Sequence, residues 1–263
     1  MAQSGRSAAE EAVIVGAGVI GLACAYALCR DGVRPLVIDA AEPGAGASWG
    51  NGGLIAFAPQ IVGPVPGPDV LRQSVLWLLQ PRSPLRLVPR PAFEYARWIG
   101  AFISSCSAEA ATFGLRATLA FNAKTAELFD DLVRDGLEFE MDTAGVVVVY
   151  QNRRAFNAAR KRLTEGSGGV ALSANEALDA EPLLRDDACA GAIRYDGERQ
   201  VRPDALTRAL VDRLTQMGIE IRSGCRCTGL LRSGTRVTAL ETPTGTIRAN
   251  AFILAAGSEP SRV

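Results

Sequence analysis

The stretch that decides the fold is residues 12–39, AVIVGAGVIGLACAYALCRDGVRPLVID. It begins with a short apolar run, residues 12–15, of the kind that forms a buried parallel strand. Small and apolar residues at helical spacing then predict a helix over Val19–Arg30, which Gly32 ends. Residues 34–38 predict a second strand. Strand, helix and strand in this order form a βαβ unit, so the stretch predicts an α/β fold with a parallel sheet.

Three glycines between the first strand and the helix indicate a nucleotide site. Gly16, Gly18 and Gly21 form a G-x-G-x-x-G motif, which is a weak signal alone but becomes specific between a strand and a helix. The first glycine allows a tight turn, the second lets a pyrophosphate approach the backbone, and the third lets helix and strand pack closely. Asp39 ends the second strand, where an acidic side chain binds a ribose and disfavours a 2′-phosphate. The pattern predicts NAD or FAD rather than NADP.

The composition excludes several kinds of chemistry. The 263 residues include no histidine, which rules out Ser-His-Asp and Cys-His nucleophile pairs and HExxH zinc sites. Lys and Arg total 28, as do Asp and Glu, and a net charge of zero gives no general attraction for nucleic acid. The six cysteines contain one close pair, Cys225 and Cys227, so we predict free thiols in a reducing compartment and no metal site.

The sequence carries no signal for export or for a membrane span. Its first residues lack the basic start of a signal peptide, and no apolar stretch has the roughly 20 residues that a transmembrane helix needs. We therefore expect a cytoplasmic protein, with peripheral contact to the inner face of the cytoplasmic membrane as an alternative.

The rest of the chain departs from a regular alternation of strands and helices. A glycine-rich loop and proline-rich connectors are followed by long helices, predicted over Phe93–Ser105 and residues 108–134. Further on, a helix is predicted over residues 204–217, and strands over residues 246–248 and 251–255. Because a nicotinamide dehydrogenase usually continues with more βαβ units, this break favours FAD over NAD.

The predicted elements place the chain in the α/β class. The family resemblance described next implies a Rossmann-like FAD-binding domain with a discontinuous, incomplete α+β substrate domain. The expected ranges are a disordered leader at 1–11, the FAD-binding domain at 12–60 and 190–263, and an incomplete substrate domain at 61–189.

Several segments together resemble one family of flavoproteins. They are residues 13–28, the VID that ends at Asp39, the loop 48–54 with the sequence SWGNGGL, the Pro/Trp stretch from Pro64 to Trp98, residues 201–203 and residues 253–257. In these segments the chain is similar to the D-amino-acid dehydrogenase group of the FAD-dependent amine oxidoreductases. Many flavoproteins share the glycine motif, whereas the loop 48–54 and the Pro/Trp stretch are more specific.

The resemblance implies cofactor contacts beyond the glycine motif. Ser48, Asn51 and residues 52–54 would lie along the flavin and its ribityl-phosphate chain. Cys227 would place its backbone at the adenine, and residues 256–257 would close over the dinucleotide. Asn51 has the alternative role of a turn residue, and Cys227 that of a structural thiol. The predicted cofactor-binding residues are Val15, Gly16, Ala17, Gly18, Val19, Ile20, Gly21, Asp39, Ser48, Asn51, Gly52, Gly53, Leu54, Cys227, Ala256 and Gly257.

The resemblance also implies a reaction. A D-amino acid or related amine would pass a hydride from its α-carbon to the flavin, and the imine would hydrolyse to a 2-oxo acid and ammonia. A quinone or another acceptor would then take the electrons. No step needs histidine.

The length of the chain limits what the resemblance assigns. Members of the family continue well past the position matching Val263, so we expect a chain truncated at its C-terminus and a second polypeptide that supplies the missing part. No catalytic residue is assigned for this reason. The alternatives are a non-catalytic nucleotide-binding remnant or partner subunit and, less favoured, an NAD-dependent dehydrogenase.

Overall fold

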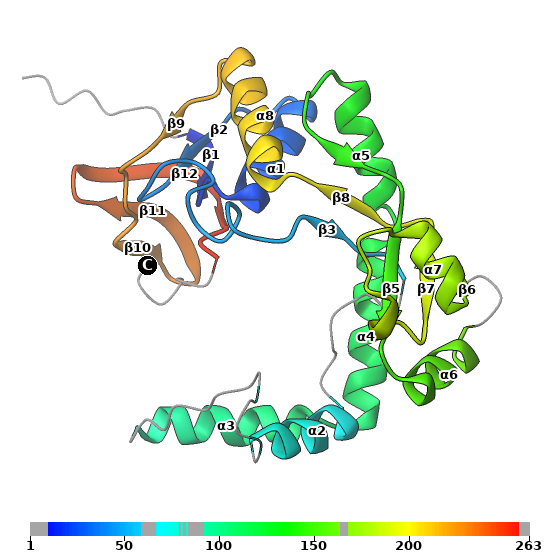
Figure 1. Cartoon of the computed structure of the whole chain (residues 1–263). Helices are drawn as coiled ribbons and strands as arrows, with labels where there is room; N and C mark the ends of the chain where they lie inside the picture. Colours follow the sequence, from blue (N-terminus) through cyan, green and yellow to red (C-terminus); the bar gives the residue numbers. More distant parts are fainter. Residues whose placement is uncertain are drawn as a thin grey trace, which may run out of the picture. The chain divides into compact units, whose positions relative to one another are not determined.

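The computed structural model describes residues 10–58, 67–78, 80, 83, 92–163 and 168–257 (Figure 1). Residues 1–9 of the expected leader lie outside this part. The chain divides into two compact units. The first consists of Met1–Leu54, Asp130–Asp142 and Gln200–Val263, and the second of Ile55–Phe129 and Thr143–Arg199.

These units differ in three places from the ranges expected for the domains. The described residues 55–58, expected in the FAD-binding domain, belong to the second unit. Asp130–Asp142 belongs to the first unit, where Tyr26 Oη donates a hydrogen bond of 2.5 Å to Asp135 Oδ2. Residues 190–199 belong to the second unit, because β7 (Gly191–Tyr195) pairs with two strands of that unit.

A six-stranded sheet in the order β10–β11–β12–β1–β2–β9 forms the centre of the first unit. β1 (Glu10–Val15) lies between β2 (Pro35–Ile38) and β12 (Gly245–Leu254) and is parallel to both. Its last four residues are all buried, as expected for an inner strand of a parallel sheet. The strand begins at Glu10, earlier than the apolar run predicts, because Glu10 pairs with Ala249 of β12.

Two helices of the first unit pack against each other. α1 (Val19–Arg30) has the bounds that the sequence predicts. α8 (Pro203–Gln216) begins with a proline, whose fixed φ suits the first turn of a helix. Leu210 and Leu214 of α8 are buried on its inner face. β9 (Ile221–Arg222) follows α8 and extends the parallel sheet beside β2.

One prediction about the last strands is wrong. In place of separate strands over residues 246–248 and 251–255, β12 is a single strand. Its first half pairs antiparallel with β11 (Arg236–Thr242), and its second half pairs parallel with β1. β11 pairs in turn with β10 (Gly229–Ser233). The exposed Asn250 separates the predicted strands, but the change of partner carries the ladder past it.

The second unit contains a three-stranded antiparallel sheet with β7 at its centre, between β5 (Val146–Tyr150) and β6 (Gly169–Leu172). Phe156, Ile193 and Tyr195 are buried together against one side of this sheet. The sequence does not predict β6, because the glycines at 166, 168 and 169 favour a turn there.

Three short helical segments accompany this sheet. α6 (Arg153–Lys161) contributes the buried Phe156. α7 (Ala174–Ala180) begins with a capping box in which Ser173 and Glu176 each accept from the other's backbone amide. The last is the short 3₁₀ helix η1 (Asp186–Ala188).

A buried carboxylate holds the start of the second unit. Glu198 is 1% exposed and accepts hydrogen bonds from the backbone amides of Phe57 at 2.8 Å and Ala58 at 2.7 Å. Charge-assisted bonds of this kind offset the cost of burying a carboxylate. They fix the segment that follows the glycine-rich loop.

The predicted helix over residues 108–134 is wrong, because it is broken into two. Asn122 ends the first part, and its side-chain nitrogen Nδ2 donates a hydrogen bond of 3.1 Å to the Ala56 carbonyl oxygen. Of the helices in the described ranges, none is long and apolar enough to cross a membrane. The helices of this region are α2 (Pro68–Leu78), α3 (Phe93–Ser105), α4 (Ala108–Asn122) and α5 (Thr125–Arg134).

A third sheet has the order β3–β8–β4 and consists of β3 (Leu54–Ile55), β8 (Arg199–Val201) and β4 (Met141–Asp142). Gly53 precedes β3, and its carbonyl oxygen accepts a hydrogen bond of 2.9 Å from the Val201 amide. Gly53 has a φ of +66°, and a Cβ there would lie 1.9 Å from the Val201 carbonyl oxygen. Only glycine fits this position.

We expect Gly53→Ala to lower the free energy of unfolding by more than the 1–2 kcal/mol or so that an L-residue pays for a left-handed conformation, because the Val201 backbone must also move. The neighbouring Gly52→Ala is the matched control, since a Cβ at Gly52 meets no atom within 4 Å and should change stability by no more than about 0.5 kcal/mol. Urea denaturation measures both. Equal stabilities of the two variants would contradict the close approach.

Candidate functional site

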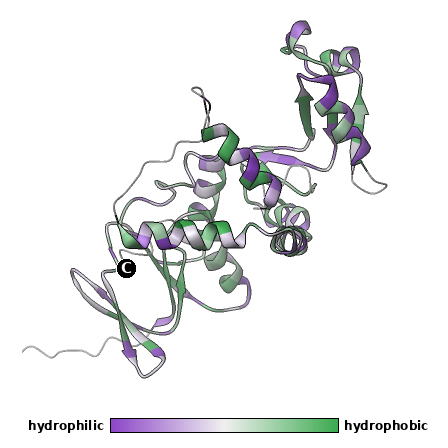
Figure 2. Cartoon of the chain, turned by 90° about the horizontal axis from the view of Figure 1, so that it is seen from below, coloured by the Kyte–Doolittle hydropathy of each residue, from purple (hydrophilic) through white to green (hydrophobic). Residues whose placement is uncertain are grey.

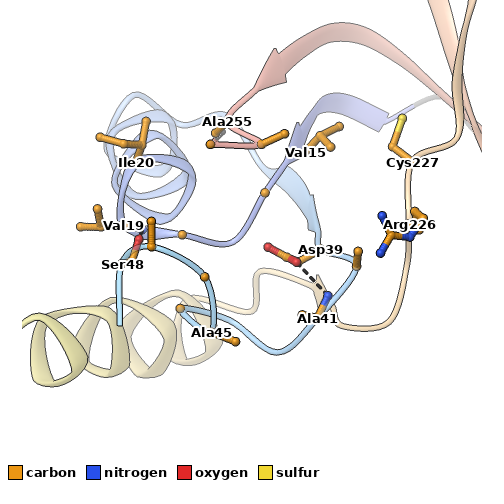
Figure 3. Close-up of a pocket in the computed structure, with 18 of the residues that line it drawn as sticks. Val15, Val19, Ile20, Asp39, Ala41, Ala45, Ser48, Arg226, Cys227 and Ala255 are labelled. Atoms are coloured by element: carbon orange, nitrogen blue, oxygen red, sulfur yellow. Dashed lines mark hydrogen bonds between the residues drawn. The ribbon is translucent and has the colours of Figure 1, made fainter. Parts of the chain in front are cut away.

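A cavity of about 590 Å³ lies in the first unit, where the parallel strands β1, β2 and β12 end (Figure 3). Ligands of open α/β sheets bind at the carboxyl ends of the strands. The cavity brings together most of the residues predicted to bind the cofactor. These are Val15, Gly16, Gly18, Val19, Ile20, Asp39, Ser48, Asn51, Cys227, Ala256 and Gly257.

The glycine loop passes so close to the end of β12 that side chains are excluded. Gly16 has a φ of +110°, and a Cβ there would lie 2.4 Å from the Ala255 carbonyl oxygen. The Ala255 amide donates a hydrogen bond of 2.8 Å to the Val15 carbonyl oxygen. Two backbone segments therefore meet with no side chain between them, which leaves main-chain groups to line this wall of the cavity.

Five predicted residues do not line the cavity. A Cβ on Gly21 would lie 1.8 Å from the Gly16 carbonyl oxygen, so this glycine allows α1 to pack on the loop that precedes it. Gly53 allows the contact with Val201 described above. The five residues are Ala17, Gly21, Gly52, Gly53 and Leu54.

The start of α1 faces the cavity and can bind an anion. Gly18 is the N-cap residue and has no side chain to accept from the first turn. Ser48, from the glycine-rich loop, accepts a hydrogen bond of 2.9 Å from the Val19 amide. The other amides of a first helical turn have no acceptor within the helix, and together with the helix dipole they favour a phosphate.

Asp39 is held in one orientation by two backbone amides. Its Oδ2 accepts from Ala17 at 2.6 Å and its Oδ1 accepts from Ala41 at 2.8 Å. A carboxylate has about four lone-pair positions, so roughly two are left for the hydroxyls of a sugar. Asp39 can therefore stabilise the glycine loop and bind a ribose at the same time.

Asn51 uses its side chain within its own loop. Its amide nitrogen donates to the Ser48 carbonyl oxygen at 2.9 Å, and its amide oxygen accepts from the Gly53 amide at 2.7 Å. These bonds are those of a turn residue. Asn51 lines the cavity and also sets the conformation of the loop 48–54.

The sequence interpretation missed part of the wall. The glycine and alanine content of residues 40–47 is the signal that could have identified one segment, because small residues let a ligand approach the backbone. Arg226 carries no comparable signal, since it comes from a connection between β9 and β10. The missed residues are Ala40, Ala41, Gly44, Ala45, Gly46, Ala47, Cys225, Arg226 and Ala255.

The two cysteines of this connection differ in burial. Cys227 is buried in the core under β1 and β2, and Cys225 packs partly against the same cluster. Burial raises the pKa of the Cys227 thiol, so it is protonated at neutral pH and not nucleophilic. In the described ranges, no group of three or more His, Cys, Asp or Glu residues could hold a metal ion.

The chain matches the family model of the FAD dependent oxidoreductases over residues 11–263. It is 33% identical to D-amino acid dehydrogenase 2 of Ralstonia nicotianae over 93% of its own length and 59% of that protein. It is 32% identical to D-amino acid dehydrogenase 2 of Pseudomonas aeruginosa over 95% of its length and 60% of that protein. The chain thus spans about three fifths of these relatives.

Solved structures of low sequence identity share the fold. Glycine oxidase from Geobacillus kaustophilus superposes with a TM-score of 0.66 at 20% identity, covering 97% of this chain and 57% of that one. Glycine oxidase from Bacillus cereus gives a TM-score of 0.62 at 18% identity, covering 95% and 56%. The predicted mixed α/β fold with a parallel sheet is confirmed, and the chain belongs to the FAD-dependent oxidoreductase family.

Proposed function

We propose that this chain binds FAD in the cavity and serves in the oxidative deamination of D-amino acids to 2-oxo acids and ammonia. The observation that carries the proposal is the cavity at the ends of β1, β2 and β12, with a helix N-terminus and an oriented Asp39 on its wall. The relatives named D-amino acid dehydrogenase, which match nearly the whole of this chain, support the substrate class.

The described residues fit the pyrophosphate and ribose of the cofactor. Gly16 and Gly18 leave open backbone where a Cβ would meet Ala255 or Ser48, and the first turn of α1 would receive the phosphates. Asp39 would accept from the ribose hydroxyls through the lone pairs that its two amide bonds leave free. The residues near Gly257 would close the cavity on the other side.

The loop 48–54 would lead from the pyrophosphate toward the flavin. Ser48 bonds to α1 and Asn51 fixes the turn, while Gly53 joins the loop to Val201. Residues 52–54 would therefore act by holding the backbone in place. FAD, when bound, supplies the acceptor for the hydride that leaves the substrate α-carbon.

We also propose that a second polypeptide segment covers part of this site. Ile20 lines the cavity and is 66% exposed. Trp49 and Leu254, which flank cavity residues, are exposed as well. Large apolar side chains grouped around a binding site are a common feature of surfaces that another chain covers.

The test of the cofactor and reaction uses the purified chain. We expect flavin absorption bands at a ratio near 1:1, and loss of the oxidised bands when a D-amino acid is added without oxygen. The L-enantiomer is the control. A colourless protein that FAD does not reconstitute would support a non-catalytic remnant, and quenching of protein fluorescence by NAD would support an NAD-dependent dehydrogenase.

We expect Asp39→Ala to weaken FAD binding by about 10- to 100-fold, the range for losing hydrogen bonds to a charged group. Asp39→Asn should also weaken it, because the new NH2 group would face one of the two amides that now donate to the carboxylate. Asp31→Ala, at an exposed position after α1, should bind FAD normally. Unchanged affinity in both Asp39 variants would exclude the ribose role.

We propose a cytoplasmic location with peripheral contact to the inner face of the cytoplasmic membrane, where a quinone would accept the electrons. Support comes from α2 and α3, in which no described residue is buried. On α3, the ring centroids of Trp98 and Phe102 lie 5.6 Å apart in a stacked arrangement, and these side chains are 59% and 41% exposed. Figure 2 shows mostly hydrophobic and intermediate residues along α3. Exposed aromatic residues on amphipathic helices are a common feature of proteins that bind membrane interfaces.

We expect the chain to cosediment with vesicles of phosphatidylcholine and phosphatidylglycerol, and Trp98→Glu to reduce the bound fraction severalfold, because a charge at the interface opposes insertion. Leu183→Glu is the matched control, since Leu183 is 91% exposed but lies outside α2 and α3. Equal losses in the two variants, or no binding of the unmodified chain, would contradict the membrane contact.

A further inference from the structure

We propose that Arg226 forms one face of the adenine-binding slot and stacks its guanidinium on the base, so that this residue contributes to recognition of an adenine dinucleotide. The proposal rests on the cofactor site proposed above and adds the determinant at its far end. Arg226 belongs to the connection between β9 and β10 and lines the cavity.

The position of Arg226 along the cavity identifies the part of the ligand that it meets. The N-terminus of α1 marks the pyrophosphate and Asp39 marks the ribose, so the base lies beyond Asp39. The connection is tied to that point, because the Cys225 amide donates a hydrogen bond of 2.7 Å to the Asp39 carbonyl oxygen. Its next residue, Arg226, therefore stands beside the ribose position on the side of the base.

Arg226 lies between two cysteines that pack against the core. Cys227 is buried in the core, and Cys225 packs partly against the same cluster. Both cysteines also border the cavity, and Arg226 between them is exposed and lines it. Figure 3 shows Arg226 on the same side as Asp39 and Ala41, with its guanidinium nitrogens directed into the cavity.

The guanidinium of Arg226 is available to a ligand. Within the described ranges no hydrogen bond or ion pair of its side chain is present, whereas Arg222 in the preceding strand is paired with Glu220 at 2.7 Å. An arginine with a structural role typically forms an ion pair, as Arg222 does. Arg226 instead presents an unpaired cation on the wall of a cavity whose other side chains are mostly small and apolar.

A planar guanidinium stacks well on a flat aromatic ring and is weakly hydrated. Such contacts change affinity by about 3- to 30-fold, depending on how far water is excluded. An arginine beside a ribose can also bind a 2′-phosphate, but here the Asp39 carboxylate, which Ala17 and Ala41 hold in place, repels that phosphate. The geometry thus favours the base as the partner of Arg226.

The test is calorimetric titration of the flavin-free full chain with ADP, with FMN as a ligand that lacks adenine. We expect R226A and R226K to weaken ADP binding by about 3- to 30-fold, because lysine keeps the charge but loses the plane. FMN affinity should not change. R232A, which removes an exposed arginine from β10, should bind both ligands normally. Equal thermal unfolding of all variants serves as the folding control.

Several results would overturn the inference. Unchanged ADP affinity in R226A would show that Arg226 does not contact the base. Full ADP affinity in R226K would show that the charge of Arg226, and not stacking, contributes to binding. Tighter binding of 2′,5′-ADP than of ADP, lost in R226A, would assign Arg226 to a 2′-phosphate. If the unmodified chain binds neither ADP nor FAD, the proposed function fails as well; if it binds both and R226A matches it, only the role of Arg226 fails.

Discussion

The parallel pairing of β1 with β12 is the contact on which the site depends. It aligns Val15 with Leu254, and the next residue of each strand belongs to the cavity wall. Gly16 can approach Ala255 only because it lacks a side chain. A shift of one residue in this register would turn every side chain of β12 to the other face of the sheet. It would also move residues 255–257, which line the cavity, away from the glycine loop.

Asp39 connects the other segments that line the cavity to this pair of strands. Its carboxylate holds the glycine loop through Ala17 and the following turn through Ala41. Its backbone amide donates to the Arg222 carbonyl oxygen at 3.0 Å, and its carbonyl oxygen accepts from Cys225. One residue thus orients segments that are far apart in the sequence. Substitutions of Asp39 therefore act on the shape of the cavity as well as on a direct contact.

Local patterns predicted the elements whose stabilising contacts lie within a short stretch of sequence. α1 has its predicted bounds because the motif, the helix and the terminating glycine are contiguous. The first helix ends at Asn122, whose side chain contacts Ala56 far away in the sequence. β12 persists past Asn250 because its partner strand changes. No local periodicity encodes such contacts.

In the candidate site, too, the sequence predicts the features encoded in a short stretch and misses those that depend on distant contacts. The glycine motif and Asp39 follow from spacing alone, whereas Ser48 and Cys227 were assigned through resemblance to a family. Arg226 escaped both kinds of reasoning, because its place on the wall depends on the hydrogen bond between Cys225 and Asp39 and on the burial of Cys227. The segment that carries it has no regular structure in which a sequence pattern could appear.

The central place of β1 in the sheet has a consequence for synthesis on the ribosome. β1, α1 and β2 leave the ribosome early, but the partner on the other side of β1 is β12, which follows every other described strand in the chain. Until β12 emerges, a buried apolar strand presents an unpaired edge to other chains. Pairings this distant in sequence form slowly and expose the nascent chain to aggregation. Synthesis of this protein should therefore depend on chaperones that shield the edge of β1 until translation of β12 is complete.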